Sequence, residues 1–257
     1  MSEKAVKTKE SGEVVPFSAD IFEQDAGMGL ENMGQDDLAL PFLKVLSRSS
    51  DEVEELEGAK AGDIFNSISN VSYDGKKGVR VIPCAYQRRF LEWTPRGVGS
   101  RAPVSIYTPE DVLPAVERGD DNRDYVVGGQ GSYLEETHQH FVLLIDEDGS
   151  FLTALISMKS TQLKKSRRWN STIAQRTLMG KNGPFQPPRF SHIYRLKTVA
   201  ENNARGNWHG WDISLEGVVE DGNMYAQAKT FAESISRGEV EVKHMNEGDD
   251  AGDDAPF

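Results

Sequence analysis

The sequence has very little cysteine and no long apolar run. Cys84 is the single cysteine among 257 residues, which excludes an internal disulfide framework and a cysteine-rich zinc site. No apolar stretch reaches the ~18 residues that a transmembrane helix needs, and the first residues are polar rather than signal-like. We therefore expect a globular cytoplasmic protein without a membrane partner, large enough for one large domain or two small ones.

The local motifs of common enzymes are also missing. There is no Walker phosphate loop, no Gly-x-Ser-x-Gly nucleophile elbow and no dinucleotide fingerprint. His138 and His140 share one face of a predicted strand, but no further ligand follows at metal-binding spacing. We expect no enzyme activity, no metal and no cofactor, although scattered carboxylates could build a metal-dependent nuclease site that no local motif would reveal.

Acidic residues are absent from one segment, residues 159–197, although the protein carries a formal charge of −12. This basic segment holds ten of the 29 basic residues, so the rest of the chain has 19 basic and 41 acidic residues. Solvated helices usually mix both signs. Aromatic rings such as Trp169 and Tyr194 lie between the cations, and such rings can stack on bases while cations meet phosphates. We interpret the basic segment as polyanion-binding; the alternative is a solvated helix face followed by a core strand.

A second strand interleaves arginine with aromatic residues, between Tyr86 and Trp93. Strand alternation places Arg88 and Arg89 on opposite faces, and both faces stay candidates for ligand contact. Trp208 is predicted to be an exposed stacking platform. The candidate nucleic-acid-binding residues are Lys164, Lys165, Arg167, Arg168 and Trp169, then Arg88, Arg89 and Trp93, then Tyr194, Arg195 and Lys197.

Short strand-like runs between turn residues predict a mainly β fold with some α (α+β). Asp74-Gly75 predicts a hairpin between the first two runs. A helix between the third and fourth long strands is the order of an OB-fold, a small Greek-key barrel. The expected strands are 63–73, 78–93, 133–145, 151–157, 190–199 and 208–219, and the expected helices are 160–179 and 223–236, the latter ending at Gly238.

We predict three regions. Residues 1–37 form a flexible acidic arm, residues 38–240 an OB-like nucleic-acid-binding domain with flanking helices, and residues 241–257 a disordered acidic tail. Within the domain, the proline- and glycine-rich residues 95–131 are predicted to be a loop insertion with a short helix at 110–117. The apolar residues 38–46 are expected to dock on the domain.

The C-terminus ends in Asp253-Asp254-Ala255-Pro256-Phe257. It resembles the tip of the bacterial single-stranded DNA-binding proteins, which close on Asp-Asp-Asp-Ile-Pro-Phe, except that Ala255 replaces the bulky apolar residue. The segments 41–45 and 58–64 are similar to single-stranded DNA-binding proteins of tailed bacteriophages. An aromatic ring beside a terminal carboxylate, preceded by acids, can dock in a pocket with a basic rim.

The resemblance implies an OB-fold protein that coats and protects single-stranded DNA in phage replication, recombination and repair, within the host cytoplasm. Replication or recombination proteins would bind Asp253, Asp254, Pro256 and Phe257, and self-association stays open. The acidic tail can also fold back on the basic segment and compete with DNA. The alternatives are a protein-interaction adaptor with a basic patch and a metal-dependent nuclease.

Overall fold

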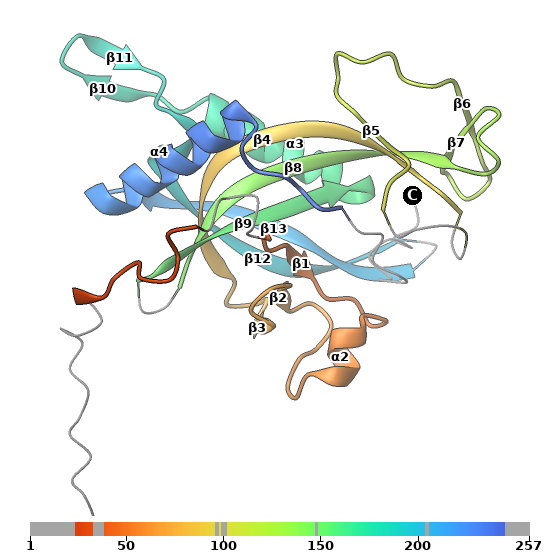
Figure 1. Ribbon diagram of the computed structural model, residues 1–257, viewed down its shortest axis with the longest axis horizontal. Helices are drawn as coiled ribbons and strands as arrows, with labels where there is room; N and C mark the ends of the chain where they lie inside the picture. The colour runs from red at the N-terminus through yellow and green to blue at the C-terminus, as the bar shows by residue number, and fades with distance from the viewer. Residues whose placement is uncertain are drawn as a thin grey trace, which may run out of the picture. The chain divides into compact units, whose positions relative to one another are not determined.

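A computed structural model describes residues 24–32, 39–95, 98, 102–146, 149–203 and 206–244 (Figure 1). The chain divides into two compact units, Met1–Leu38 and Ala39–Phe257. In the first unit the described residues form consecutive turns, in which the Met28 N–H donates to Asp25 C=O at 3.1 Å. Most of the predicted acidic arm and nearly all of the predicted acidic tail lie outside the described residues.

The second unit is built on a large antiparallel sheet in which the long strands β4 and β8 run side by side (Figure 1). In chain order its main strands are β4, β8, β9 and β12, and in space they lie β12-β4-β8-β9. This 4-1-2-3 arrangement is a Greek key, with β13 added outside β12. Among the described residues no pairing joins β9 to β13, so the sheet is not a closed barrel. The bounds are β4 Val79–Trp93, β8 Tyr133–Ile145, β9 Phe151–Lys159, β12 His192–Asn203 and β13 Gly206–Val218.

The insertion at 95–131 is not the predicted loop and short helix. It holds the strands β5 (Ser105–Tyr107), β6 (Val116–Arg118) and β7 (Asp124–Val126). β5 pairs with the end of β4, and β7 pairs with the start of β8 and with β6. The helix predicted at 110–117 is wrong, because Pro114 restricts the residue before it to extended backbone and β6 begins two residues later.

Two hydrophobic cores cover opposite faces of the sheet. Val79 and Val81 on β4 face the first core, while Ile82 and Cys84 face the second. Simple alternation accounts for these two pairs, whereas the neighbours Cys84 and Ala85 both contact the second core because the register shifts at a β-bulge between Pro83 and Ala85. The second core is closed by α4 (Gly222–Arg237), which confirms the predicted last helix.

The ends of α4 show why the sequence predicts it well. The Asp221 side chain accepts from the Met224 N–H at 2.7 Å and caps the first turn. Gly238 ends the helix with a left-handed backbone, φ +73°, a conformation that glycine adopts without steric cost. Both signals are local, so no distant contact is needed to place this helix.

The described part of the predicted apolar segment, residues 39–46, docks on the domain as expected, with Leu43 and Val45 on the first core and Leu40 and Phe42 on the second. It contains β1 (Leu43–Val45), and Leu43 and Leu46 are buried. Phe42 bridges to Leu155 of β9, whose N–H donates to Pro41 C=O at 2.8 Å.

A small sheet extends this segment in the order β1-β2-β3, with β2 at Ile64–Asn66, β3 at Val71–Tyr73 and the short helix α2 at Asp51–Glu55 before them. The hairpin predicted at Asp74-Gly75 is wrong, since β3 pairs with β2 instead of β4.

Between β9 and β12 the chain forms a helix and a hairpin. The 3₁₀ turn η2 (Ser160–Gln162) leads into α3 (Leu163–Ala174), so the predicted helix starts as expected but ends five residues early. It is followed by β10 (Leu178–Gly180), β11 (Gly183–Phe185) and the 3₁₀ turn η3 (Arg189–Ser191). In the part of the chain that the structure describes, no helix has the length and apolarity to cross a membrane.

Candidate nucleic-acid interface

The helix α3 separates its buried side from a basic outer side. Ser166 and Trp169 are its buried residues, whereas Lys164, Arg167 and Arg168 are exposed. Arg167 and Arg168 follow Lys164 by three and four residues, so the helical period places both beside Lys164 on the outer side of the helix. We call these three residues the α3 basic face. The helix contains no acidic residue, so its own sequence offers them no ion-pair partner.

Arg88 on β4 joins this face through a shared carboxylate. Its Nε lies 2.9 Å from Glu136 Oε1, and Arg167 Nη2 lies 3.2 Å from the same oxygen. The two arginine side chains are 43% and 59% exposed. Exposed ion pairs contribute only about 0–1 kcal/mol, so a phosphate can replace the carboxylate at modest cost. The Arg88 guanidinium also lies 4.8 Å from the centroid of the Phe90 ring.

The other predicted cations lie elsewhere or are neutralised. Arg89 lies on the opposite face of β4 and donates to Gln87 Oε1 at 2.7 Å. Lys165 forms an ion pair with Glu201 of β12.

On β12, Arg195 pairs with Glu216 at 3.0 Å, and the same carboxylate also binds Arg80. Strand alternation places Lys197 on the same face as Arg195. The basic segment therefore does not fold into one continuous cationic surface.

Three of the four predicted stacking rings are buried, which corrects the expectation that they meet bases. Trp93, Trp169 and Tyr194 are 6%, 2% and 1% exposed. Trp169 stacks on the His140 ring at 4.6 Å and packs edge-on against Tyr194 at 5.7 Å. Burying such large rings stabilises the fold more than leaving them exposed to solvent would. Trp208 is half-buried, with its Nε1 donating to Glu201 Oε2 at 2.8 Å.

A chain of polar side chains under α3 runs from an arginine to a carboxylate. A guanidinium only donates, so Arg189 Nη2 donates to His140 Nδ1 at 2.9 Å and leaves the proton of that ring on Nε2. His140 Nε2–H then donates to Ser166 Oγ at 2.7 Å. The Ser166 hydroxyl donates to His138 Nδ1 at 2.7 Å, and His138 Nε2–H donates to Glu136 Oε1 at 2.9 Å. Every proton in this hydrogen-bond chain points toward Glu136.

The pKa directions agree with two neutral histidines in the chain. Burial lowers the pKa of His138, and it holds the pKa of His140 well below its ordinary value, with Arg189 and His138 adding to the effect. Although burial raises the pKa of Glu136, the His138 hydrogen bond and the charges of Arg88 and Arg167 lower it on balance. Glu136 therefore stays ionised and anchors one end.

Arg189 at the other end is a largely buried cation. Burial lowers its pKa to about 10. Its Nη1 donates to Asn170 Oδ1 at 2.9 Å, and its guanidinium lies 5.6 Å and 5.8 Å from the rings of Tyr86 and Trp169. The contacts of this guanidinium among the described residues are with neutral groups, and the hydrogen-bond chain links it to the carboxylate of Glu136.

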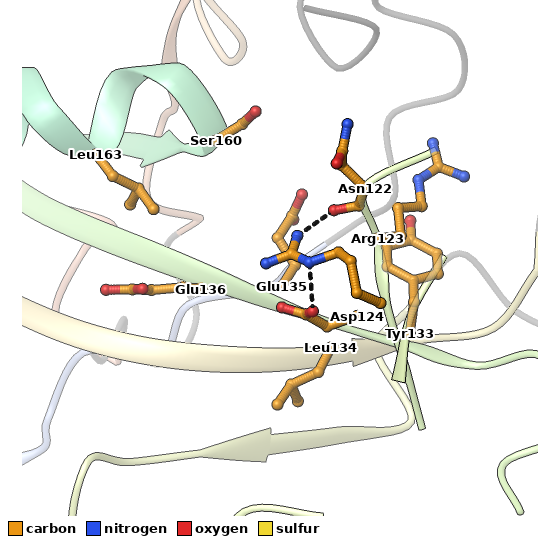
Figure 2. Close-up of a pocket in the computed structure, with 10 residues that line it drawn as sticks. Asn122, Arg123, Asp124, Tyr133, Leu134, Glu135, Glu136, Ser160 and Leu163 are labelled. Atoms are coloured by element: carbon orange, nitrogen blue, oxygen red, sulfur yellow. Dashed lines mark hydrogen bonds and ion pairs between the residues drawn. The ribbon is translucent and has the colours of Figure 1, made fainter. Parts of the chain in front are cut away.

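A pocket of about 220 Å³ opens beside Glu136 (Figure 2). It lies between the β6–β7 hairpin, the start of β8 and the start of α3. Arg118 and Asp124, which are partners across the β6–β7 hairpin, form an ion pair at 3.0 Å in one wall of the pocket. Ser160 has a left-handed backbone, φ +53°, and its buried Oγ has no partner in the described part of the chain. The lining residues are Arg118, Asn122, Arg123, Asp124, Tyr133, Leu134, Glu135, Glu136, Ser160 and Leu163.

Sequence reasoning missed the buried hydrogen-bond chain. A signal was present, because Glu136, His138 and His140 alternate on the inward face of a strand whose later residues on that face are apolar. Ser166 and Arg189 carry no comparable signal, since only the packing of α3 and η3 on β8 brings them in. The partner-binding residues predicted at the C-terminus, Asp253 to Phe257, lie outside the described residues.

No cluster of three or more His, Cys, Asp or Glu residues suited to a metal ion occurs among the residues that are described.

A family model described as Pam3 phage gp34-like protein matches residues 9–241. That range includes α3, the whole main sheet and α4. Searches of curated proteins and of solved structures found no significant match. Since the family match spans most of the sequence, the chain belongs to the family of Pam3 phage gp34-like proteins.

Proposed function

We propose that this protein binds single-stranded DNA without catalysing a reaction, and that it coats and protects the strand in phage replication, recombination and repair. The observation that carries the proposal is the α3 basic face, joined by Arg88, on the surface of a Greek-key sheet. Cations on one surface attract a polyanion even when the protein as a whole is acidic, because the field near a surface depends on the local charges.

The connectivity supports an OB-like domain. In chain order the long strands are β4, β8 and β9, then α3, then β12 and β13. A helix after the third of five strands, in a partly open Greek key, is the arrangement of an OB-fold. OB-folds bind oligonucleotides through their second and third strands and the loops beside them. Here those strands are β8 and β9, and α3 follows β9 directly.

The size of the basic face sets the expected salt dependence. Four cations, Lys164, Arg167, Arg168 and Arg88, are available for phosphates. Each phosphate contact with a single strand lowers the slope of log K against log salt by about 0.7, so full engagement predicts a slope near about −3. Arg88 and Arg167 must release Glu136 to bind phosphate, which favours a smaller slope for partial engagement.

The acidic C-terminal tail is proposed to recruit replication or recombination proteins and to compete with DNA for the α3 basic face. Removal of residues 247–257 should therefore tighten single-strand binding at low salt, with the difference shrinking as salt screens the attraction. Fluorescence anisotropy across a salt series measures this. Equal affinity of the truncated and full-length proteins at every salt concentration would contradict the competition.

A titration with a fluorescent poly-dT oligonucleotide tests the proposed function, with a duplex of the same length as control and a gel of the recovered strand. We expect salt-dependent binding that favours the single strand, with the strand intact. Absence of binding at low salt would favour the adaptor alternative. Loss of the strand with magnesium, prevented by a chelator, would favour the nuclease alternative.

A further inference from the structure

The β10–β11 hairpin projects from the sheet and helices of the second unit (Figure 1). Its strands pair Leu178 with Phe185 and Met179 with Pro184 around a two-residue turn. Met179 is 79% exposed and Phe185 is 46% exposed. A two-stranded hairpin is at best marginally stable alone in water, and an aromatic ring left half-exposed on one of its faces, as Phe185 is, points to a contact that covers it.

Phe185 is held in place by a glycine. A Cβ added at Gly180 would lie only 3.1 Å from Phe185 Cδ1, so the ring packs against the backbone of the opposite strand. Any larger residue at Gly180 would displace the ring. The backbone therefore supports one side of the ring while nearly half of the residue stays open to solvent.

The hairpin is fixed to the helix that carries the α3 basic face. Gln186 Nε2 donates to Ala174 C=O at the end of α3, at 2.9 Å. Arg189, just after the hairpin, donates to Asn170 Oδ1 at 2.9 Å. Residues 175–188 include two cations and no acid. The hairpin therefore extends the basic region of α3 and adds apolar side chains that α3 does not expose.

We propose that the β10–β11 hairpin is a base-contacting element. Phe185 stacks on an unpaired base of the strand whose backbone lies along the α3 basic face, and Lys181 at the turn meets a phosphate. This inference rests on the proposed function and replaces the buried Trp93, Trp169 and Tyr194 as the source of stacking. A single strand fits because it combines negative charge with flat apolar rings, and this hairpin is the complement of both.

Three substitutions at one position separate stacking from other contacts. Phe185→Ala removes the ring, Phe185→Leu keeps an apolar side chain without a flat face, and Phe185→Trp keeps a flat ring. We expect about tenfold weaker binding of poly-dT for the first two and near-normal binding for the third, since stacking depends on the π-face. The salt slope should not change, whereas Lys181→Ala should reduce it by about 0.7.

Met179→Ala is the matched control, because Met179 is exposed on the other face of the same hairpin. It should leave poly-dT binding unchanged. Photocrosslinking of an oligonucleotide containing 5-iodouracil to the unaltered full-length protein, followed by peptide mass spectrometry, should place the crosslink at Phe185. This second measurement decides the case even if a substitution disturbs the hairpin.

The outcomes separate the inference from the function on which it rests. If the unaltered protein binds poly-dT while Phe185→Ala and Phe185→Leu bind equally well and no crosslink forms at the hairpin, the inference fails and the proposed function stands. If Phe185→Leu binds poly-dT normally, no flat ring is needed and the stacking inference fails. If Phe185→Ala instead abolishes self-association measured by light scattering, the hairpin meets protein rather than a base. If the unaltered protein does not bind poly-dT, both fail together.

Discussion

The helix α3 and the strand β12 both carry dense runs of predicted DNA-binding residues. They differ in how these cations form ion pairs with carboxylates of other elements. On α3, Lys164 and Arg168 are exposed on a helix without acidic residues. On β12, Arg195 is held by Glu216, which comes from the neighbouring strand β13 and also binds Arg80. The neighbouring strand β13 pairs with β12 along its whole length and supplies Glu216, whereas among the described residues on the outer side of α3 only Arg167 meets a carboxylate of another element, Glu136 of β8. The cost of freeing a cation for DNA is therefore lower on α3.

Charge reversal on α3 should have the largest effect on binding. Changing Lys164, Arg167 and Arg168 together to Glu should weaken poly-dT binding by more than about 100-fold at low salt, because phosphate contacts are lost and repulsion is added. Anisotropy titration measures the change, and thermal unfolding checks that the fold is kept.

The matched control on β12 changes Arg195 and Lys197 to Ala. It should weaken binding only by about threefold or less, the effect of distant charges screened by salt. An equal loss from the α3 and β12 variants would break the distinction between the two regions. If the α3 variant bound poly-dT as tightly as the unaltered protein, α3 would not be part of the interface.

Within α3, the buried and exposed sides should differ in stability. Ser166→Ala removes both an acceptor and a donor from the hydrogen-bond chain and leaves His138 and His140 without that partner. The free energy of unfolding should fall by about 1–3 kcal/mol, the cost of unsatisfied buried polar groups. Urea unfolding measures it.

The control for this prediction is Ser171→Ala, on the exposed side of the same helix, where the hydroxyl donates to Arg167 C=O at 3.0 Å. Its effect should stay within about 0.5 kcal/mol. If the two serine variants lost the same stability, the buried hydrogen-bond chain would not be a stabilising element.

Acidic pH should act on stability before it acts on the basic face. Burial lowers the pKa of His138, His140 and His192 in the folded protein, and it lowers that of His244 to about 4. The unfolded chain therefore binds more protons once the pH falls below about 6.5, the ordinary histidine value. Stability is fully present above that pH and is lost as the pH falls toward about 4.

Melting temperatures between pH 7.5 and 4.5 measure this smaller, graded effect. The arginine and lysine side chains of the α3 basic face keep their charge over that range, so poly-dT binding should persist wherever the protein stays folded. A melting temperature independent of pH would contradict the neutral, buried histidines. Loss of binding at a pH where the fold is intact would show that the histidines take part in binding directly.

Much of the fold follows from local sequence patterns. Alternation predicted β8 and β9, the glycine stop at Gly238 predicted the end of α4, and residues 39–46 of the apolar segment dock as expected. The misses have a shared cause. Nothing local shows that β3 pairs with β2 rather than β4, that residues 95–131 extend the sheet, or that α3 stops at Ala174 because a hairpin follows.

The sequence by itself determined that residues 159–197 carry all their charge with one sign and that Arg88 and Arg89 lie on opposite faces of one strand. Only the tertiary structure decided which of those cations are free, because Glu136, Glu201 and Glu216 reach them from other elements. It also decided that the rings of Trp169 and Tyr194 fill a core. Charge and periodicity are properties of a segment, whereas burial and pairing depend on which segments meet.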